Sequence, residues 1–373
     1  MRALIYASEA LRMFLRRLRV AFLGVRRYPG SPEAVCRKII LDCYDLKKGY
    51  FRVSGSHGHF REFYCRDFGW CAESLILLGY RRQVLKTLDY ALGIFRRHGR
   101  VEQTISPGGR PFTFPNAYSP DALAFLVHSL RLAGDRRLVA KYRGFIEQEA
   151  RRYLETAVDP VSGLIRKGVQ FSSMKDYSVR SSSCYDNVMT AMLKDDLEHL
   201  GLANPFRKYD YRKLIMGNFW AGSYFLDDLS GRKAVCADAN ILPFWSGVIA
   251  DRQIMSRAIA SLAREGLDSP FPAKYTSGRD DSQKMIWQET FAGDYERDAV
   301  WAHVGLMHIK VASLADRRLA RKYLLGYERR IARHRNFLEV YDRDGRPFRT
   351  LLYYSDEGML WAANFLALKR KLG

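Results

Sequence analysis

The sequence lacks the signatures of several large functional classes. Its six cysteines form no Cys-x-x-Cys pair and stand beside no histidine cluster, so we expect no zinc site. It has no glycine-rich loop of the kind that holds phosphates, and no Ser, His and Asp order that indicates a triad. No segment reaches the roughly 18 uninterrupted apolar residues that cross a bilayer. We therefore expect neither a metal, nor a cofactor, nor a membrane span.

Acidic residues are also scarce. The chain has 40 Asp and Glu against 61 Lys and Arg, which gives a formal net charge of +21. Such an excess can indicate a nucleic-acid partner. The basic residues are scattered, however, and the Arg-Arg doublets beginning at 81, 96, 136 and 151 fall beside acids on expected helix faces. We interpret them as solvated faces and do not expect nucleic acid to bind.

Apolar and aromatic residues are plentiful. They account for 47% and 13% of the chain, respectively, which is enough for a large core in one globular body. The scattered cysteines fit reduced, buried thiols, and such thiols are typical of a cytoplasmic protein.

Helical periodicity dominates, because apolar residues recur at spacings of three and four along most of the chain. After an N-terminal helix we expect about twelve more, over 32–44, 69–80, 82–99, 120–134, 136–157, 185–201, 210–226, 240–249, 252–266, 297–315, 316–334 and 355–371. The fold class is therefore all-α.

The connections alternate between tight turns and long loops. The long loops cover 45–66, 100–118, 158–184, 267–295 and 335–354. Loops of more than about twelve residues are uncommon in compact domains and are usually functional. The alternation predicts helical hairpins arranged in a ring, with the long loops collected at one face.

Residues 1–30 are typical of a basic amphipathic helix. The apolar run that a signal peptide needs is interrupted by Arg12, Arg16, Arg17 and Arg19. Such a helix can dock on the main body or lie on an anionic membrane surface. We expect docking, because burial of the apolar stripe within the protein is the commoner fate, and membrane contact is the less favoured outcome. Residues 31–373 are expected to form a single catalytic domain.

Three of the long loops combine acids with aromatic rings. The first ends in RDFGW, the third in DYSVRSSSCYDN, and the fifth contains NFLEVYDRDGRPF. Aromatic rings beside carboxylates suit sugars, because a pyranose has apolar C–H faces and hydroxyls that need fixed polar partners. The expected sugar contacts are Arg66, Asp67, Trp70, Tyr177, Arg180, Tyr185, Asn187, Trp287, Trp301 and Tyr341.

These motifs, in this order, resemble the six-hairpin glycosidases, whose fold is an (α/α)6 barrel. The matching stretches are RDFGW, YDN, DANILPFWSGVI, DYERDAVWAHVGLMHI, and LEVYDRDGRPF leading into EGMLWAANFLAL. The order is most similar to the branch of trehalases, processing α-glucosidases, mannosylglycerate hydrolases and the glucosidase part of glycogen debranching enzymes. The resemblance implies a glycoside hydrolase that cleaves a terminal α-linked sugar from a small saccharide or glycoconjugate, without a cofactor.

The resemblance also implies roles for individual residues. The general acid of that branch is the Asp of a DN step, which corresponds to Asp186, and the general base is a Glu in an E-x-Y loop, which corresponds to Glu339. An early Arg-Asp step grips the terminal sugar, which implies Arg66 and Asp67. The glycine of the base loop, Gly345, arrives one residue early.

Four other positions depart from the family pattern. Tyr185 and Val188 flank the DN step where Trp and Ser are usual, and Ala362 and Ala363 follow the final Trp where Thr is usual. These changes bear on the substrate more than on the acid.

The residues themselves fit the two roles. Burial of Asp186 among aromatic rings would raise its pKa, as a general acid requires, and the arginines at 333, 335 and 343 would keep Glu339 ionised. Because the two carboxyls come from different hairpins, we expect them on opposite sides of the sugar. That placement leaves room for a water and favours inversion of configuration.

Other interpretations stay open at this point. Asp186 can be a helix cap, Glu339 a surface loop carboxylate, and Asp67 and Trp70 a cap and a core anchor. The rival acids and base are Glu296, Asp294 and Glu357.

Two alternative functions also remain. One is another sugar-active enzyme on this barrel, an epimerase or unsaturated-glucuronyl hydrolase. The other is a non-catalytic basic scaffold that binds an anionic partner.

Overall fold

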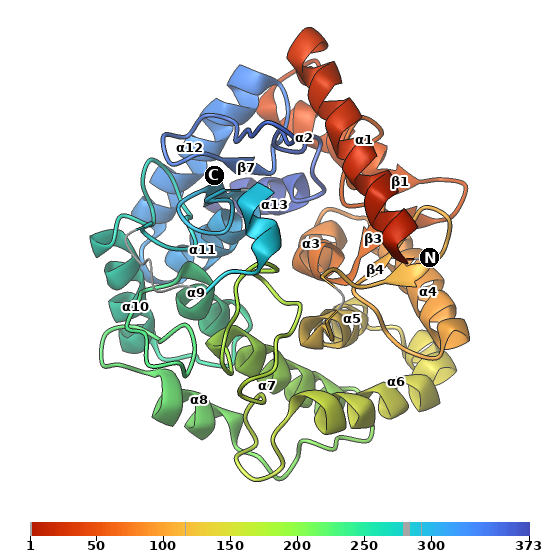
Figure 1. Cartoon of the computed structure of the whole chain (residues 1–373), viewed down its shortest axis with the longest axis vertical. Coiled ribbons are helices and arrows are strands. Elements are labelled where there is room, and N and C mark those ends of the chain that lie inside the picture. The colour runs from red at the N-terminus through yellow and green to blue at the C-terminus, as the bar shows by residue number, and fades with distance from the viewer. Residues whose placement is uncertain (1, 116, 279–283, 292) are drawn as a thin grey trace.

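The computed structural model describes residues 2–115, 117–278, 284–291 and 293–373, so positions 279–283 and 292 of the expected loop 267–295 lie outside the described residues. Thirteen α-helices dominate the described part of the chain. Six of them form an inner ring in which each packs against the next (Figure 1): α3 (Cys65–Leu77), α5 (Pro120–Ala133), α7 (Cys184–His199), α9 (Ala237–Trp245), α11 (Ala302–Ala315) and α13 (Ala362–Leu372). Contacts between α13 and α3 close the ring.

Six further helices surround this ring, each preceding one inner helix. They are α2 (Pro32–Cys43), α4 (Arg81–His98), α6 (Arg136–Ala157), α8 (Tyr211–Phe219), α10 (Arg252–Arg264) and α12 (Arg317–His334). The predicted all-α (α/α)6 barrel is confirmed.

Sequence pattern decides which ring a helix joins. In α5, twelve of fourteen residues are buried, because this inner helix is apolar on nearly all sides. In α12 only five residues are buried, at spacings of three and four, which is the pattern of a helix with one face in the core.

Turn chemistry sets the direction of the helices. Gly134 takes a left-handed conformation (φ +61°) to end α5, and Asp135 caps α6 directly afterwards. A similar short connection follows α3, α9 and α11. The inner helices therefore begin at the opposite end of the barrel, where the long loops arrive.

Short strands pair within the long loops and between them. β1 (Tyr44–Asp45) pairs with β2 (Tyr50–Phe51), and β6 (Val300–Trp301) pairs with β7 (Val340–Tyr341), both antiparallel. β4 (Thr104–Ile105) lies between β3 (Phe63–Tyr64) and β5 (Pro111–Phe112) in an antiparallel sheet. The pairing β6–β7 is the one that sets Glu339 directly beside the start of α11.

Most expected boundaries of the twelve barrel helices lie within three residues of those observed, and five do not. Helix α3 begins at Cys65 rather than 69, α8 ends at Phe219 rather than 226, α9 ends at Trp245 rather than 249, α11 begins at Ala302 rather than 297, and α13 begins at Ala362 rather than 355. Residues 355–361 stay in a loop because Leu338 bridges to Glu357 and Gly358 adopts a positive φ of 68°. Cross-loop pairing overrides the helical pattern there.

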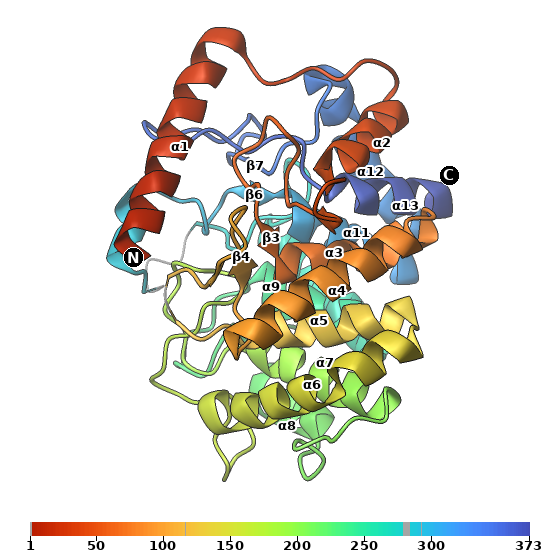
Figure 2. The same ribbon diagram turned by 90° about the vertical axis from the view of Figure 1, so that its right-hand side faces the viewer.

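Helix α1 (Arg2–Leu23) lies at the side of the barrel where the strands and long loops gather (Figure 2). Arg16 donates to the carbonyls of Tyr354 at 2.6 Å and Ser355 at 3.0 Å, and Arg19 pairs with Glu357. The helix therefore docks as expected, through its arginines together with Val20 and Met13, whereas most of its described large apolar side chains stay exposed. None of the described helices has the length and apolar character needed to cross a membrane.

Candidate active site

Four inner helices place an aspartate in their first turn at the long-loop end. These are Asp67, Asp121, Asp186 and Asp238 on α3, α5, α7 and α9, and the last three are buried. Sequence analysis singled out Asp67 and Asp186 and missed the other two. Their shared signal was an acid just inside an apolar helix, in SPDALAF and CADANIL.

Asp186 is not the cap of α7. Ser183 is the N-cap, and its hydroxyl accepts from the Asp186 N–H at 3.0 Å. The same hydroxyl donates to Asp186 Oδ2, whereas the buried Oδ1 has no hydrogen-bond partner among the described residues. Burial raises the pKa of Asp186 to about 6, against the opposing charge of Arg180. The carboxyl group therefore has one anchored oxygen and one unused oxygen.

Asn187 holds the third long loop in place. Its Oδ1 accepts from the Ile165 N–H at 3.0 Å, and its Nδ2 donates to the Ser183 carbonyl at 2.7 Å. Both polar atoms are thus used by backbone groups, so the structure gives Asn187 a role in shaping the loop.

A buried network surrounds Arg66. Its Nε lies 2.7 Å from Asp121 Oδ2, and the Tyr185 hydroxyl donates to that same oxygen at 2.7 Å. The other end of the guanidinium lies 3.6 Å from Asp176 Oδ1. Arg66 therefore links the start of α3 to α5, α7 and the third long loop.

Aromatic rings from three inner helices meet beside this network. Trp70 stacks on His303 with ring centroids 4.2 Å apart, and Trp361 lies 4.6 Å from His303. Trp361 Nε1 donates to Asp67 at 3.0 Å, while burial raises the pKa of Asp67 to about 7. Trp70 is thus a core anchor, and Asp67 is held by a side chain rather than acting as a cap.

Arg180 belongs to a second charged cluster. It lies 2.8 Å from Asp238, and Lys175 lies 3.1 Å from Asp227. Asp227, Cys236 and Asp238 bring their ligand atoms within 4.8 Å of one another, but both carboxylates are already paired with these buried cations. The cluster does not fit a metal ion, because a further positive charge would face Lys175 and Arg180 at close range.

Glu339 lies on the long loop between α12 and α13. It accepts from the Tyr295 hydroxyl at 2.8 Å, from the Asp356 N–H at 3.1 Å and from the Tyr353 hydroxyl. Burial and the nearby charge of Asp356 raise its pKa to about 7. Glu339 is therefore no surface carboxylate, and the expectation that the arginines at 333, 335 and 343 keep it ionised gives way to this buried, hydroxyl-lined setting.

The third long loop connects the two clusters. Glu296 accepts from the N–H groups of Asp176 and Tyr177 at 2.7 and 2.9 Å, and burial together with Asp176 raises the pKa of Glu296 to about 8. The Tyr177 ring lies 6.3 Å from that of Tyr295, the residue that donates to Glu339. Tyr177 thus stands between the Arg66 network and Glu339.

Comparison with known proteins shows one curated relative for part of the chain. Over 142 residues the chain is 31% identical to a trehalase of Tenebrio molitor, which is 37% of this chain and 24% of that protein. The chain thus spans about a quarter of the length of this curated relative. No protein-family model matches.

Several solved structures share the fold of this chain over most of its length. A glycosidase in complex with glucose has a TM-score of 0.65 at 14% identity, covering 92% of this chain and 97% of the other. A rhamnosidase from Klebsiella oxytoca, with rhamnose bound, has a TM-score of 0.62 at 14% identity, covering 92% of this chain and 65% of the other. A mannosylglycerate hydrolase from Thermus thermophilus, in complex with glucose, has a TM-score of 0.58 at 12% identity, covering 91% of this chain and 100% of the other. The chain has the fold of the six-hairpin glycosidases.

On this glycosidase fold, two of the rival carboxyls lie in other roles. Asp294 is exposed and has a positive φ of 56°. Glu357 is buried, pairs with Arg16 and Arg19, and accepts from the Arg26 N–H at 2.6 Å. Glu357 therefore fastens the N-terminal helix, and only Glu296 stays near the candidate site.

Three expected sugar contacts lie in different settings. Trp301 is buried beside Tyr295, with ring centroids 4.5 Å apart. Trp287 is 71% exposed on a 3-10 helix, Trp287–Phe291. Tyr341 packs edge-on against Phe271 at 5.1 Å. The structure brings Trp301 into the cluster around Glu339, and it gives Tyr341 a packing role.

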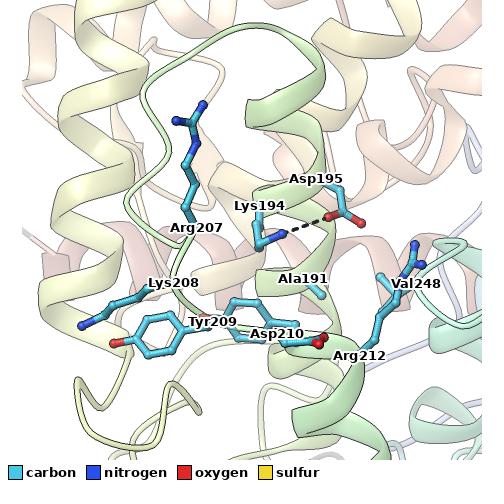
Figure 3. A pocket seen from close by; sticks show the side chains of 10 residues that line it. Ala191, Lys194, Asp195, Arg207, Lys208, Tyr209, Asp210, Arg212 and Val248 are labelled. Carbon is cyan, nitrogen blue, oxygen red and sulfur yellow. Dashed lines mark ion pairs between the residues drawn. The ribbon is translucent and has the colours of Figure 1, made fainter.

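A pocket of about 480 Å³ opens elsewhere, along the later turns of α7 (Figure 3). It is lined by Lys194, Asp195, Arg207 and Arg212 among others. None of the sugar contacts expected from the sequence lines it. The candidate active site is the carboxyl and aromatic cluster at the long-loop end.

Proposed function

We propose that this chain is an inverting glycoside hydrolase that removes a terminal α-linked sugar, with Asp186 as general acid and Glu339 as general base. Residues 31–373 act as one catalytic domain in this proposal. The observation that carries it is the contrast between the two carboxyls: Asp186 has a buried oxygen with no partner among the described residues, whereas Glu339 is surrounded by three donors.

The hydrogen bonds support the assignment of roles. A general acid must present a proton to the leaving oxygen, and Asp186 Oδ1 has no hydrogen-bond partner in the described structure that would compete for it. A general base must be ionised, and N–H and O–H donors stabilise the charged form of Glu339. Burial raises the pKa of both carboxyls, to about 6 in Asp186 and to about 7 in Glu339, so both titrate near neutral pH.

The positions of the two carboxyls in the chain support the proposed inversion of configuration. Asp186 belongs to the first turn of α7, and Glu339 immediately precedes β7 on the loop between α12 and α13. A sugar held between the two would meet one carboxyl on each face, with space for the water that attacks the anomeric carbon.

The sugar itself would be held by the buried charged and aromatic groups of the same end. Arg66, Asp67 and Arg180 offer polar partners to hydroxyls, while Tyr177, Tyr185 and Trp301 offer rings to C–H faces. The proteins named above include a trehalase, a mannosylglycerate hydrolase and two structures in complex with glucose, which supports the proposal of an exo-acting α-glycosidase of a small saccharide or glycoconjugate.

A panel of aryl and disaccharide α-glycosides tests this proposal through released sugar. The Asp186→Asn variant should lose on the order of 10²-fold or more in rate. Asp195→Asn is the matched control, because Asp195 lies on the same helix but is half-exposed. Full activity of Asp186→Asn would contradict the assignment. Steeply salt-dependent binding of an anionic partner, with no sugar released from any glycoside, would favour the scaffold.

His303 supports a second candidate, a sugar epimerase. This histidine is the second residue of α11, stacks on Trp70 and lies 3.1 Å from the Tyr275 hydroxyl. A histidine therefore lies beside the carboxyl and aromatic cluster of the candidate active site. An epimerase would interconvert free reducing sugars and would lose that activity in His303→Gln. Absence of any change in a reducing-sugar panel would exclude it.

A further inference from the structure

The outer side of α1 carries an uncovered apolar stripe. Its members recur at spacings of three and four, so they share one face of the helix. They are Leu11, Phe14, Leu15, Leu18 and Phe22, and all five are exposed. Phe22 is 84% exposed and Leu15 is 56% exposed, which is unusual for large apolar side chains gathered in one row.

The orientation of α1 is fixed by ionic contacts on its other side. Arg12 pairs with Glu62, Arg16 with Asp356, and Arg19 with Glu357. The two glutamates and the aspartate are all buried. These bonds hold the arginine side against the barrel, so the apolar stripe faces away from it.

A neighbouring loop enlarges the apolar surface. Arg17 donates to the Thr350 carbonyl at 3.2 Å, which brings residues 350–352 beside the helix. Leu351 is 86% exposed and Leu352 is 39% exposed. The docking face defined by the stripe and these two leucines therefore comes from both ends of the chain.

Exposed positive charge borders the docking face. Arg26 and Arg27 follow the stripe, Arg349 precedes the two leucines, and all three are exposed. The whole chain carries a net charge of +21. An apolar surface rimmed by arginines is complementary to a bilayer with anionic headgroups, where rings and aliphatic chains enter the acyl boundary and cations remain at the phosphates.

We propose that this docking face binds the surface of an anionic phospholipid bilayer, with α1 lying flat in the interface. A second copy of the chain fits less well, because a two-fold contact through the same patch would oppose two sets of arginines on two strongly basic proteins. The proposal does not depend on the catalytic assignment, since it concerns only the outer side of α1 and the adjoining leucines.

Vesicle flotation tests the docking face. The intact protein should float with vesicles of phosphatidylcholine and phosphatidylserine, and much less with vesicles of phosphatidylcholine alone. The double variant Leu15→Ser, Phe22→Ser should bind on the order of tenfold more weakly, because the lost apolar surface no longer enters the bilayer. The matched control is Leu77→Ser, Leu314→Ser, which removes two exposed leucines at the short-turn end of α3 and α11.

Three outcomes would overturn the proposal. One is no flotation of the intact protein with anionic vesicles. Another is flotation that salt abolishes and the double variant does not weaken, which would indicate charge alone. The third is an intact protein that elutes as a dimer and a double variant that elutes as a monomer, which would assign the face to a second copy. Unchanged circular dichroism of both double variants shows that the fold is retained.

Discussion

Arg16 Nε lies 3.1 Å from Asp356 Oδ1, and both side chains are buried. The backbone N–H of Asp356 in turn donates to Glu339. The first helix of the chain thus contacts the loop that presents the proposed base, which makes Arg16 a positioning residue.

Replacing Arg16 with Gln should therefore destabilise the protein by about 3–5 kcal/mol, because it leaves a buried carboxylate without its cation. Although burial favours its neutral form, Arg16, His59 and two backbone N–H groups hold the pKa of Asp356 below its usual value. The wild type should lose this stabilisation as the pH falls through the unfolded value of about 3.9 towards the lower folded value.

Urea unfolding at several pH values checks this. The neighbouring Arg17→Gln, which loses a bond to the Thr350 carbonyl but no ion pair with a carboxylate of the described residues, should stay close to the wild type. Equal losses in the two variants would show that Asp356 does not depend on Arg16.

Leaving-group dependence distinguishes acid from base. In Asp186→Asn the rate on an alkyl α-glycoside should fall on the order of 10²-fold or more, while an α-glycosyl fluoride, which needs no proton, should be cleaved at nearly the wild-type rate. In Glu339→Gln both substrates should be affected, because the attacking water loses its base. Parallel rate measurements on the two substrates decide it, and a Glu296→Gln variant that behaves as expected for Asp186→Asn would move the acid to Glu296.

The hydroxyls around Glu339 should control the pH profile. The reaction needs Glu339 ionised, which increases as pH rises through about 7, and Asp186 protonated, which increases as pH falls through about 6. The profile of kcat/KM should therefore be a narrow bell around these values, with only a minor fraction of the enzyme in the active form at its optimum.

Tyr353→Phe should move this bell. Removing a donor destabilises the ionised form, so the pKa of Glu339 should rise and the limb that it governs should shift to higher pH. Tyr341→Phe is the control, because Tyr341 packs against Phe271 and its ring is retained. A shift in the control of the same size would mean that Tyr341, and not Tyr353, adjoins the base.

The configuration of the first product should be inverted. If a water enters between Glu339 and the sugar, an α-linked substrate releases the β-anomer first and forms no covalent intermediate. Proton NMR during the first minutes of turnover measures this directly. Early α-anomer, or transfer of the sugar to methanol with retained configuration, would contradict the pairing of Asp186 with Glu339.

The sequence predicted a ring of helical hairpins because each helix repeats the same spacing of apolar residues, and because short turns alternate with long loops along the chain. It also placed Asp186 at the start of a helix and Glu339 in a loop, as the structure has them. Both positions could be predicted because the DN step and the E-x-Y loop are short and contiguous. Asp121 and Asp238 carried the same local signal as Asp186, an acid in the first turn of an inner helix. Asp121 lies in none of the motifs that carried the resemblance, and Asp238 opens the stretch DANILPFWSGVI but was given no role.

What local pattern could not supply was pairing between distant loops. Tyr295 and Tyr353 reach Glu339 from separate segments, and neither lies in a periodic stretch. The orientation of α1 was missed for the same reason: its apolar stripe predicted burial, yet the acids that hold its arginines, Glu62, Asp356 and Glu357, come from two remote loops.

Ring closure has a consequence for the order of folding. Helix α13 completes the ring by packing on α3, and Arg16 bonds to Tyr354 across 338 positions. During synthesis the first hairpins leave the ribosome long before their final neighbours exist. Until α13 emerges, the apolar side of α3 that will meet α13 has no partner, and Glu339 lacks Tyr353 and Asp356. The ring and the hydrogen bonds around Glu339 therefore form only after the segment from Tyr353 to α13 has been made, so the barrel closes as one unit and not hairpin by hairpin.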